Sequence, residues 1–321
     1  MHSLLRKIFL LFISSIVVFL SVYFLFGPVG KSTDGVLITV PQNEEHFDMT
    51  GALENENLIK NVWLFRLFIA GKTIESGGYY FTDSMWMWQV AAKATSTPDL
   101  LWVTINGCLR REQIGEMIGK KLGWDQSKLD DWNTAYKNLQ PEYVEGVYYP
   151  DTYLIPTSES GAEVAKRFIN RFNEAFAPYA KGFQDANIRW VTALKIASLI
   201  EREAAGSQDM PLISGVIWNR LDKNMLLQID ATLQYTHGKN ADGSWWGSID
   251  LAEKQSDSSY NSYIVKGLPP TPICSPSITS IAAVLTPEET PCLFYLHDHD
   301  GQIHCAVTYE EHKENIEVYL K

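Results

Sequence analysis

The sequence has few cysteines, little charge and no block of basic residues beyond its N-terminus. It contains four cysteines and no Cys-x-x-Cys pair, which argues against a zinc ribbon or a thioredoxin-type redox site. Charged residues make up 20% of the 321 residues and the formal net charge is −11, so we expect no nucleic-acid partner. No HExxH, Walker loop, dinucleotide fingerprint or serine nucleophile elbow occurs. We therefore expect a protein that uses neither a metal nor an organic cofactor.

The long apolar run lies at the N-terminus. Residues 8–26 (IFLLFISSIVVFLSVYFLF) carry no charge, and at about 1.5 Å per residue such a helix reaches about 28 Å, enough to cross a hydrocarbon core. The run ends without the small-x-small site of a cleaved signal peptide, so we expect a retained anchor. Because Arg6 and Lys7 precede it, the positive-inside rule places residues 1–7 in the cytoplasm. This predicts a single-pass protein of the plasma (inner) membrane with an extracytoplasmic or periplasmic body.

The cysteines leave two alternatives open. The four residues are Cys108, Cys274, Cys292 and Cys305. In an oxidising compartment they could pair, but free buried thiols fit the sequence at least as well. Cys292 and Cys305 flank an expected hairpin, yet a two-residue turn at Asp300-Gly301 would not place them opposite each other. The sequence therefore leaves open whether the cysteines pair and, if so, in which combination.

Hydrophobic periodicity predicts an α+β chain. Strands are expected at 36–40, 79–81 and 101–105 and in a hairpin at 293–307. Helices are expected at 58–70, 84–94 (with Ser84 as a candidate N-cap), 111–122 (with Gly123 as C-cap), 161–176, 188–205, 212–221 and 277–285, and at the C-terminus. The intervening residues 141–157 are too rich in Pro and Tyr for a long helix. We divide the chain after the anchor into a small α/β subdomain at 27–97, a connecting α+β region at 98–185 and a catalytic domain at 186–321.

The helix expected at 188–205 contains the most informative residue. Glu203 completes an i, i+3, i+4, i+7 pattern of otherwise apolar residues that begins at Ile196, so it shares the face that packs on the protein body. Glu201 points to another side of the helix. Desolvation raises the pKa of a carboxyl group, and a general acid requires a raised pKa. The alternative is structural: a glutamate at a helix end, paired with Arg202, Arg220 or another basic residue.

Two other clusters are weaker candidates. His297, His299 and His304 gather around the expected hairpin turn, where strand alternation could place two of them on one face and so form a metal site. An exposed polar hairpin tip explains them better. Trp245-Trp246 lies in a loop rich in Gly and Asn. The two rings could line a groove that binds sugars, or they could simply pack the loop onto the protein, and the sequence favours neither.

Six motifs in one order give the sequence a family resemblance. They are EGVYYPDTY (145–153), ASLIERE (197–203), VIWNRL (216–221), LQIDAT (227–232), SYNSY (259–263) and GLPPTPI (267–273). Together they resemble the YceG-like family of endolytic murein transglycosylases, whose layout also has an N-terminal anchor and a small unit described as LysM-like. Two departures occur: Ala204, after the second Glu, lacks the hydroxyl of the Thr that the family often has there, and Ala231 replaces the family's usual Pro. Neither removes an ionisable group.

The resemblance implies a peptidoglycan lyase. Such an enzyme cleaves between N-acetylmuramic acid and N-acetylglucosamine within glycan strands and leaves a 1,6-anhydro-muramic end. The family's catalytic residue is the second Glu of Glu-x-Glu, which is Glu203, the residue that helical spacing also selects. One carboxyl can suffice because the C6 hydroxyl of the substrate is the nucleophile. We expect polar residues of the other motifs to bind and orient the strand: Asn219, Arg220, Gln228, Asp230, Tyr260 and Asn261.

The expected partners are glycan strands, the membrane and cell-wall synthesis machinery, and two other functions compete with a transglycosylase. A muramidase would use water and would need a second carboxylate, for which Asp230 and Glu145 are the candidates. A non-catalytic wall-binding scaffold would need no acid. The mass of the product separates the two enzymes, because an anhydro end is one water lighter than a reducing end.

The missing cleavage site generates the first testable prediction. We expect the anchor to remain in the mature protein, so that N-terminal sequencing of the membrane-extracted chain finds residues before the apolar run. A mature N-terminus at or beyond Pro28 would contradict a retained anchor.

Overall fold

The computed structural model describes residues 2–44 and 46–321, with both helices and strands. This confirms the predicted α+β class. Met1, part of the segment predicted to be cytoplasmic, lies outside the described residues. The chain divides into two compact units. The first contains Met1–Val103 with Tyr153–Glu159, and the second contains Thr104–Thr152 with Ser160–Lys321.

The predicted N-terminal apolar segment is a helix, α1 (His2–Phe26). Its stretch Leu5–Phe26, 22 residues, is long and apolar enough to cross a membrane, and none of the window that defines it is buried in the protein. Side chains such as Phe9 and Phe24 are 62% and 70% exposed. A helix that is apolar on all sides and exposed on all sides fits a single-pass membrane anchor.

A four-stranded sheet organises the first unit. Its order is β1 (Val36–Val40), β2 (Gly77–Phe81), β3 (Leu100–Thr104) and β4 (Thr152–Pro156), and β1 and β2 are antiparallel with Ile38 opposite Tyr79. Gly77 is required at the start of β2, because its φ is +152° and a Cβ there would lie 2.5 Å from the Leu100 carbonyl oxygen. Three helices pack on this sheet to form one core: α2 (Met49–Asn55), α3 (Val62–Ile69) and α4 (Met87–Ala94).

Side-chain capping explains two boundaries that the sequence pattern missed. The helix predicted from residue 58 begins at Val62, because the Asn61 side chain accepts a hydrogen bond from the Leu64 amide at 3.0 Å. The prediction of Ser84 as an N-cap is wrong. Trp86 occupies that position, and its amide donates to the Gln89 side chain at 2.8 Å. Helix α2 was not predicted.

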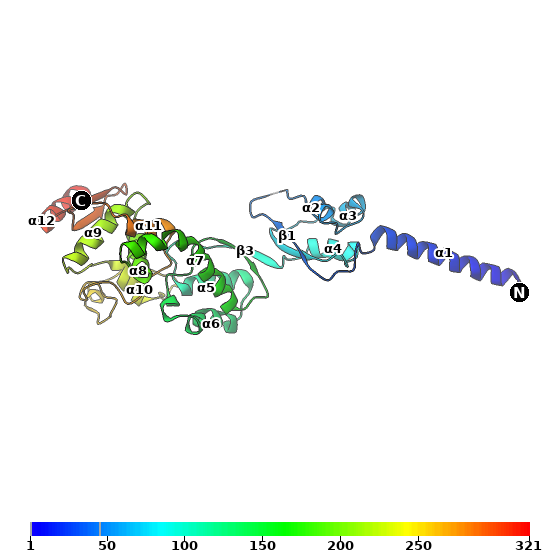
Figure 1. The fold of residues 1–321 in the computed structure, drawn as a ribbon, viewed down its shortest axis with the longest axis horizontal. Helices are drawn as coiled ribbons and strands as arrows, with labels where there is room; N and C mark the ends of the chain where they lie inside the picture. Colours follow the sequence, from blue (N-terminus) through cyan, green and yellow to red (C-terminus); the bar gives the residue numbers. More distant parts are fainter. Residues whose placement is uncertain (1, 45) are drawn as a thin grey trace. The chain divides into compact units, whose positions relative to one another are not determined.

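Buried α8 (Trp190–Glu203) lies at the centre of the second unit, in contact with α7, α9, α10 and α11 (Figure 1). The other elements of this unit are α5 (Arg111–Leu122), α6 (Gln126–Thr134), the 3-10 turns η1 (Ala135–Asn138), η2 (Pro141–Val144) and η3 (Glu253–Gln255), α7 (Gly161–Asp185), α9 (Met210–Asp222), α10 (Asp230–His237), α11 (Ile278–Leu285), β5 (Phe294–His297), β6 (Ile303–Ala306) and α12 (Tyr309–Tyr319).

Most of these helices match the predicted ones, with three exceptions. The predicted α5 is confirmed, and Gly123 ends it in the left-handed region with φ +68°. The helix predicted to end near Phe176 continues past Pro178 to Asp185. Helices α6 and α10 were not predicted, because both are short and polar.

The predicted β5–β6 hairpin is confirmed, but the prediction of a two-residue turn at Asp300-Gly301 is wrong. His297 pairs with Ile303, and the Asp298 amide donates to the Gln302 carbonyl at 2.9 Å. Three residues therefore form the turn, with Gly301 at φ +78°.

All four cysteines form disulfides, Cys108–Cys274 and Cys292–Cys305, so the alternative of free thiols is wrong. The hairpin register does not place Cys292 opposite Cys305, whose partner in β5 is Tyr295. Instead the chain bends before β5, where the Leu293 amide donates to the Ala306 carbonyl at 2.9 Å. This bend brings the two Cα atoms to 5.9 Å, a normal separation for a disulfide.

The crossing of α6 and α7 predicts that Gly161→Ala destabilises the second unit. A Cβ at Gly161 would lie 2.2 Å from the Lys128 carbonyl oxygen and 2.4 Å from the Trp132 amide nitrogen. We expect a loss of about 1–3 kcal/mol in the free energy of unfolding, as for other overpacked sites. Urea denaturation followed by circular dichroism measures it.

Gly119→Ala in α5 is the matched control. A Cβ there meets nothing closer than 3.6 Å, so better helix propensity should leave stability unchanged or raise it by up to about 1 kcal/mol. Equal effects of the two substitutions would contradict this account of the crossing.

Candidate active site

Glu203 is the last residue of α8 and lines a cavity of about 450 Å³. The helix ends here because Ala204 has extended backbone angles, while the Ala204 amide closes the last turn on the Ile200 carbonyl at 2.9 Å. The apolar residues that precede it on the same face of α8 are buried, with Ile196, Leu199 and Ile200 at 0% exposure. The predicted apolar face of α8 is therefore confirmed, and the Glu203 side chain at its end lies at the cavity wall.

Tyr295 provides the one side-chain hydrogen bond that the structure gives to the Glu203 carboxyl among the described residues. Its hydroxyl donates to Glu203 Oε2 at 2.8 Å. Burial raises the pKa of Tyr295 well above its ordinary value, so the phenol stays neutral and keeps its proton. Strand alternation in β5 puts Tyr295 and His297 on the same face. The imidazole of His297 is 3.1 Å from Asp209 Oδ2.

The pKa of Glu203 is raised above its ordinary value. Burial is the largest cause, and the charge of Asp230 acts in the same direction. The hydrogen bond from Tyr295 and the charges of His297 and Arg202 oppose the shift without cancelling it. A carboxyl with a raised pKa keeps a proton closer to neutral pH, so Glu203 is suited to give and to take one.

The structural alternative for Glu203 predicted an ion pair with Arg202, Arg220 or another basic residue. Arg202 instead lies over the Trp246 ring at 4.2 Å. Arg220 donates to the carbonyls of Leu293 and Leu227, each at 2.6 Å. In the part of the chain that the structure describes, no ion pair to Glu203 is formed.

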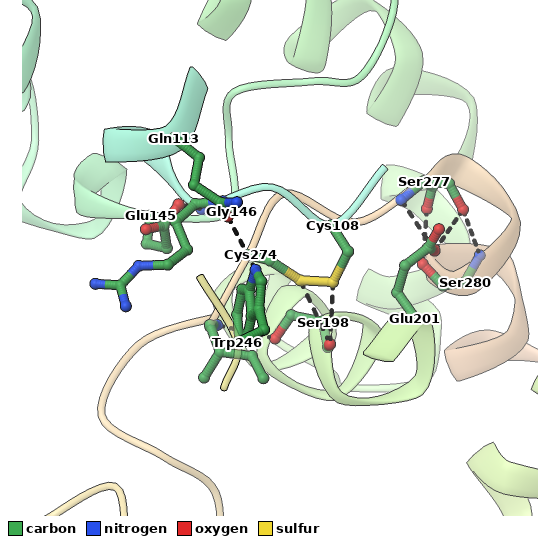
Figure 2. Close-up of a disulfide and its surroundings, with 12 residues drawn as sticks. Cys108, Gln113, Glu145, Gly146, Ser198, Glu201, Trp246, Cys274, Ser277 and Ser280 are labelled. Atoms are coloured by element: carbon green, nitrogen blue, oxygen red, sulfur yellow. Dashed lines mark hydrogen bonds between the residues drawn. A yellow bond between two sulfur atoms is a disulfide. The ribbon is translucent and has the colours of Figure 1, made fainter. Parts of the chain in front are cut away.

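Glu201 has a different position (Figure 2). Its Oε2 accepts hydrogen bonds from the Ser277 amide at 3.2 Å and from the Ser277 hydroxyl at 2.6 Å. Ser277 is the N-cap of α11, so Glu201 fixes the start of that helix and complements its dipole. The two glutamates of the Glu-x-Glu motif thus face different surroundings, as the helical spacing predicts.

The structure brings two of the six predicted binding residues to the cavity wall and places a third beside it. Arg220 and Gln228 line the cavity, and Gln228 has a φ of +54°. Asp230 accepts a hydrogen bond from the Tyr263 hydroxyl, and lies 3.1 Å from Lys254 Nζ. Both of these partners line the cavity.

The other three support the surrounding chain and do not line this cavity. Asn219 donates to the carbonyls of Thr290 and Cys292, at 2.7 and 3.1 Å, and so holds the segment that leads into the hairpin. Asn261 is 0% exposed and its amide closes the loop that precedes it. The Tyr260 hydroxyl pairs with the Thr271 hydroxyl at 2.7 Å.

Sequence reasoning missed several residues of the cavity wall, above all Tyr295. It lies in a hairpin about 90 residues after Glu203, and ordinary strand alternation gives no signal for a contact over that separation. Tyr263 stands within the SYNSY motif, which did mark its segment. The remaining polar or aromatic residues that were missed are Lys254, Phe294, Tyr309 and His312.

The weaker candidate clusters have structural partners. His304 stacks on Tyr319 with ring centroids 3.6 Å apart and lies 2.8 Å from Asp298. Within residues 2–44 and 46–321, no group of three His, Cys, Asp or Glu could hold a metal ion. Trp245 packs on Arg110 at 4.7 Å, and the Trp246 indole donates to Gln113 at 2.9 Å (Figure 2).

Glu145, one candidate for a second carboxylate, is fully buried and does not line the cavity. It accepts hydrogen bonds from the Arg111 amide at 3.1 Å and the Gly146 amide at 3.2 Å. Burial raises its pKa to about 8. Since Arg111 begins α5, Glu145 caps that helix from within the core.

Comparison with known proteins supports a family assignment. The sequence model of the YceG-like family matches residues 38–318. A protein of Bacillus subtilis strain 168 named endolytic murein transglycosylase is 27% identical over 92% of this chain and 90% of its own length. One of the same name from Streptococcus pneumoniae serotype 2 is 25% identical, and the match covers 88% of this chain but 58% of that relative. A YceG-like protein from Listeria monocytogenes shares the fold, with a TM-score of 0.62 at 23% identity over 88% of this chain and 99% of its own.

The contact between Tyr295 and Glu203 predicts that Tyr295→Phe raises the pKa of Glu203 further. The lost donor favoured the charged carboxylate, so its removal favours the protonated form. The carboxyl carbon of Glu203 can be titrated by NMR in ¹³C-glutamate-labelled protein and assigned by its absence in Glu203→Gln.

Tyr263→Phe is the control, because Tyr263 also lines the cavity but donates to Asp230. We expect it to change the Glu203 titration little. A fall in the pKa of Glu203 in Tyr295→Phe would show that the hydroxyl does not stabilise the carboxylate.

Proposed function

The chain belongs to the YceG-like family, and on that basis we propose that it is a membrane-anchored lytic transglycosylase that cleaves peptidoglycan glycan strands internally. The names of its relatives support a murein transglycosylase, which is a lyase. The observation that carries the mechanism is Glu203: a carboxyl with a raised pKa, facing a cavity and bound by one neutral hydroxyl.

Glu203 acts first as an acid and then as a base. It gives its proton to the glycosidic oxygen as the bond from that oxygen to C1 of N-acetylmuramic acid breaks. The C6 hydroxyl of the same sugar attacks C1, and the carboxylate of Glu203 takes the C6 proton. The result is a 1,6-anhydro end and a regenerated acid. An intramolecular nucleophile reaches effective molarities of about 10⁵ M or more, so a second carboxylate is not needed.

Tyr295 positions the acid for this cycle. Its hydroxyl donates to Oε2, so Oε1 is the oxygen left to hold and transfer the proton. The same hydrogen bond stabilises the carboxylate that forms once the proton has left. Tyr295 therefore fixes one oxygen and leaves the other to react.

The remaining cavity residues bind the strand. Lys254, Tyr263 and Gln228 offer donors and acceptors that match sugar hydroxyl and N-acetyl groups. Burial lowers the pKa of Arg220, but a guanidinium remains charged at neutral pH. Its positive charge favours a negative Glu203 after proton transfer, even though its own hydrogen bonds go to backbone carbonyls.

A muramidase is the second candidate function. Of its two proposed second carboxylates, Glu145 is committed to capping α5. Asp230 acts electrostatically on Glu203 and lies beside the cavity, but it is held by Tyr263 and Lys254. The geometry therefore favours the enzyme that needs one carboxyl. A non-catalytic scaffold gives no reason for a carboxyl with a raised pKa at the cavity wall.

The body is proposed to lie outside the cytoplasm. Two disulfides join all four cysteines, and such bonds persist in oxidising compartments. This agrees with the orientation that Arg6 and Lys7 predict. The sheet unit is proposed to be the LysM-like part of the family's layout, and cell-wall synthesis proteins are proposed as further partners.

The mechanism predicts that Glu203→Gln abolishes cleavage of purified glycan strands, a loss of at least about 10²–10⁴-fold, since the amide cannot transfer the proton. Mass spectrometry of the digest measures it. Circular dichroism should show an unchanged fold.

Glu201→Gln is the matched control on the same helix. Its amide oxygen still accepts hydrogen bonds from Ser277, so the loss should be less than about tenfold. Equal loss of activity in both folded variants would show that the acid was assigned to the wrong position, and full activity in Glu203→Gln would reject the mechanism.

A further inference from the structure

Helix α3 exposes large apolar side chains on the side away from its core. Phe65 is fully buried, whereas Trp63 and Leu67 are 78% and 66% exposed. At 100° per residue, Trp63 and Leu67 both lie about 160° from Phe65 and so share one face. Two neighbouring side chains of this size on one helix face form an exposed apolar patch, which is a candidate contact surface.

Helix α3 itself adjoins the end of the apolar helix α1, on the side that faces the core. Phe26, the last residue of α1, packs on Phe68 of α3 with ring centroids 6.0 Å apart. Lys60, just before α3, donates to the Tyr23 carbonyl at 3.5 Å and lies 4.9 Å from the centroid of the Tyr23 ring. The last turn of α1 therefore contacts α3 at Phe68, near the end of that helix, and Lys60, just before its start.

Two tryptophans at the start of α4 also lie near the end of α1. Trp86 contacts the Tyr23 ring edge to face at 6.0 Å, and Trp88 stacks on Trp86 at 4.6 Å. Trp88 is 43% exposed. Tyrosine and tryptophan with nearby lysine and arginine are the composition of a membrane interface.

The length of α1 fixes the depth of these contacts. Its 22-residue apolar stretch, Leu5–Phe26, extends about 33 Å, close to the thickness of about 30 Å of a hydrocarbon core. When α1 spans the bilayer, Tyr23 and Phe26 lie at its outer boundary. Side chains that contact them must then lie in the headgroup layer, a few ångströms from the acyl chains.

We propose that α3 is a second membrane contact. Trp63 and Leu67 insert into the lipid interface, while Lys60 and Arg66, both exposed, lie among anionic headgroups. The first unit would thus be held on the lipid surface through α1 and α3 together and would not swing freely on a single anchor. This inference rests on the proposed membrane anchoring and is independent of the proposed catalytic chemistry.

The test uses the full chain in lipid nanodiscs of phosphatidylethanolamine and phosphatidylglycerol. Because the native cysteines are paired, single new cysteines at three positions take a fluorescent label: Leu67→Cys in α3, Val17→Cys in α1, and Gln42→Cys. Gln42 is exposed and lies just after the C-terminal end of β1. Quenching by lipids with a nitroxide at the headgroup or deep in the acyl chain, and by iodide in water, reports the depth of each label.

We expect the label at position 67 to be quenched by the headgroup nitroxide at least about threefold more than the label at 42, with iodide giving the reverse order. The label at 17 should respond best to the deep nitroxide. If lipid quenches the label at position 17 while the label at 67 behaves like the one at 42, α1 spans the membrane but the proposal for α3 is wrong. The exposed face of α3 would then be a contact surface for a protein or a glycan. If 17 is not quenched by lipid, the anchor itself has failed, and the proposal fails with it.

Discussion

The proposed function depends on the enclosure of one carboxyl group at the end of one buried helix. Helix α8 is apolar along the face that leads to Glu203, and burial is the largest cause of the raised pKa of that residue. A carboxyl on an exposed helix end would be ionised at neutral pH and would have no proton to transfer. The hydrogen bond from Tyr295 limits the shift and fixes one oxygen, so the half-buried acid is also oriented.

The rest of the second unit holds that pair together. Asn219 and Arg220, adjacent in α9, bond to backbone carbonyls of the segment that enters β5. The Cys292–Cys305 disulfide closes the base of the same hairpin. Residues that the sequence suggested for sugar binding thus hold the hairpin that carries Tyr295, and Arg220 serves both purposes because it also lines the cavity. Loss of either support should act on catalysis through the position of Tyr295.

The sequence predicted what depends on local periodicity and missed what depends on long-range contact. The helix of Glu203, its inward face and the different direction of Glu201 follow from 3.6-residue spacing. Tyr295 and the disulfide pairing depend on how distant segments meet, which one sequence does not specify. Helices α6 and α10 were missed because they are short and polar, and the continuation of α7 past Pro178 because tertiary packing overrides local preference.

The central claim is that Glu203 works with a nucleophile built into the substrate, and an isotope measurement tests it most directly. Glycan strands are digested by the purified enzyme in H₂¹⁸O and the new muramic ends are read by mass spectrometry. The account predicts ends that are one water lighter than reducing ends and contain no ¹⁸O, because the C6 hydroxyl closes the ring. Reducing ends that have gained ¹⁸O would show that water is the nucleophile and would contradict the account.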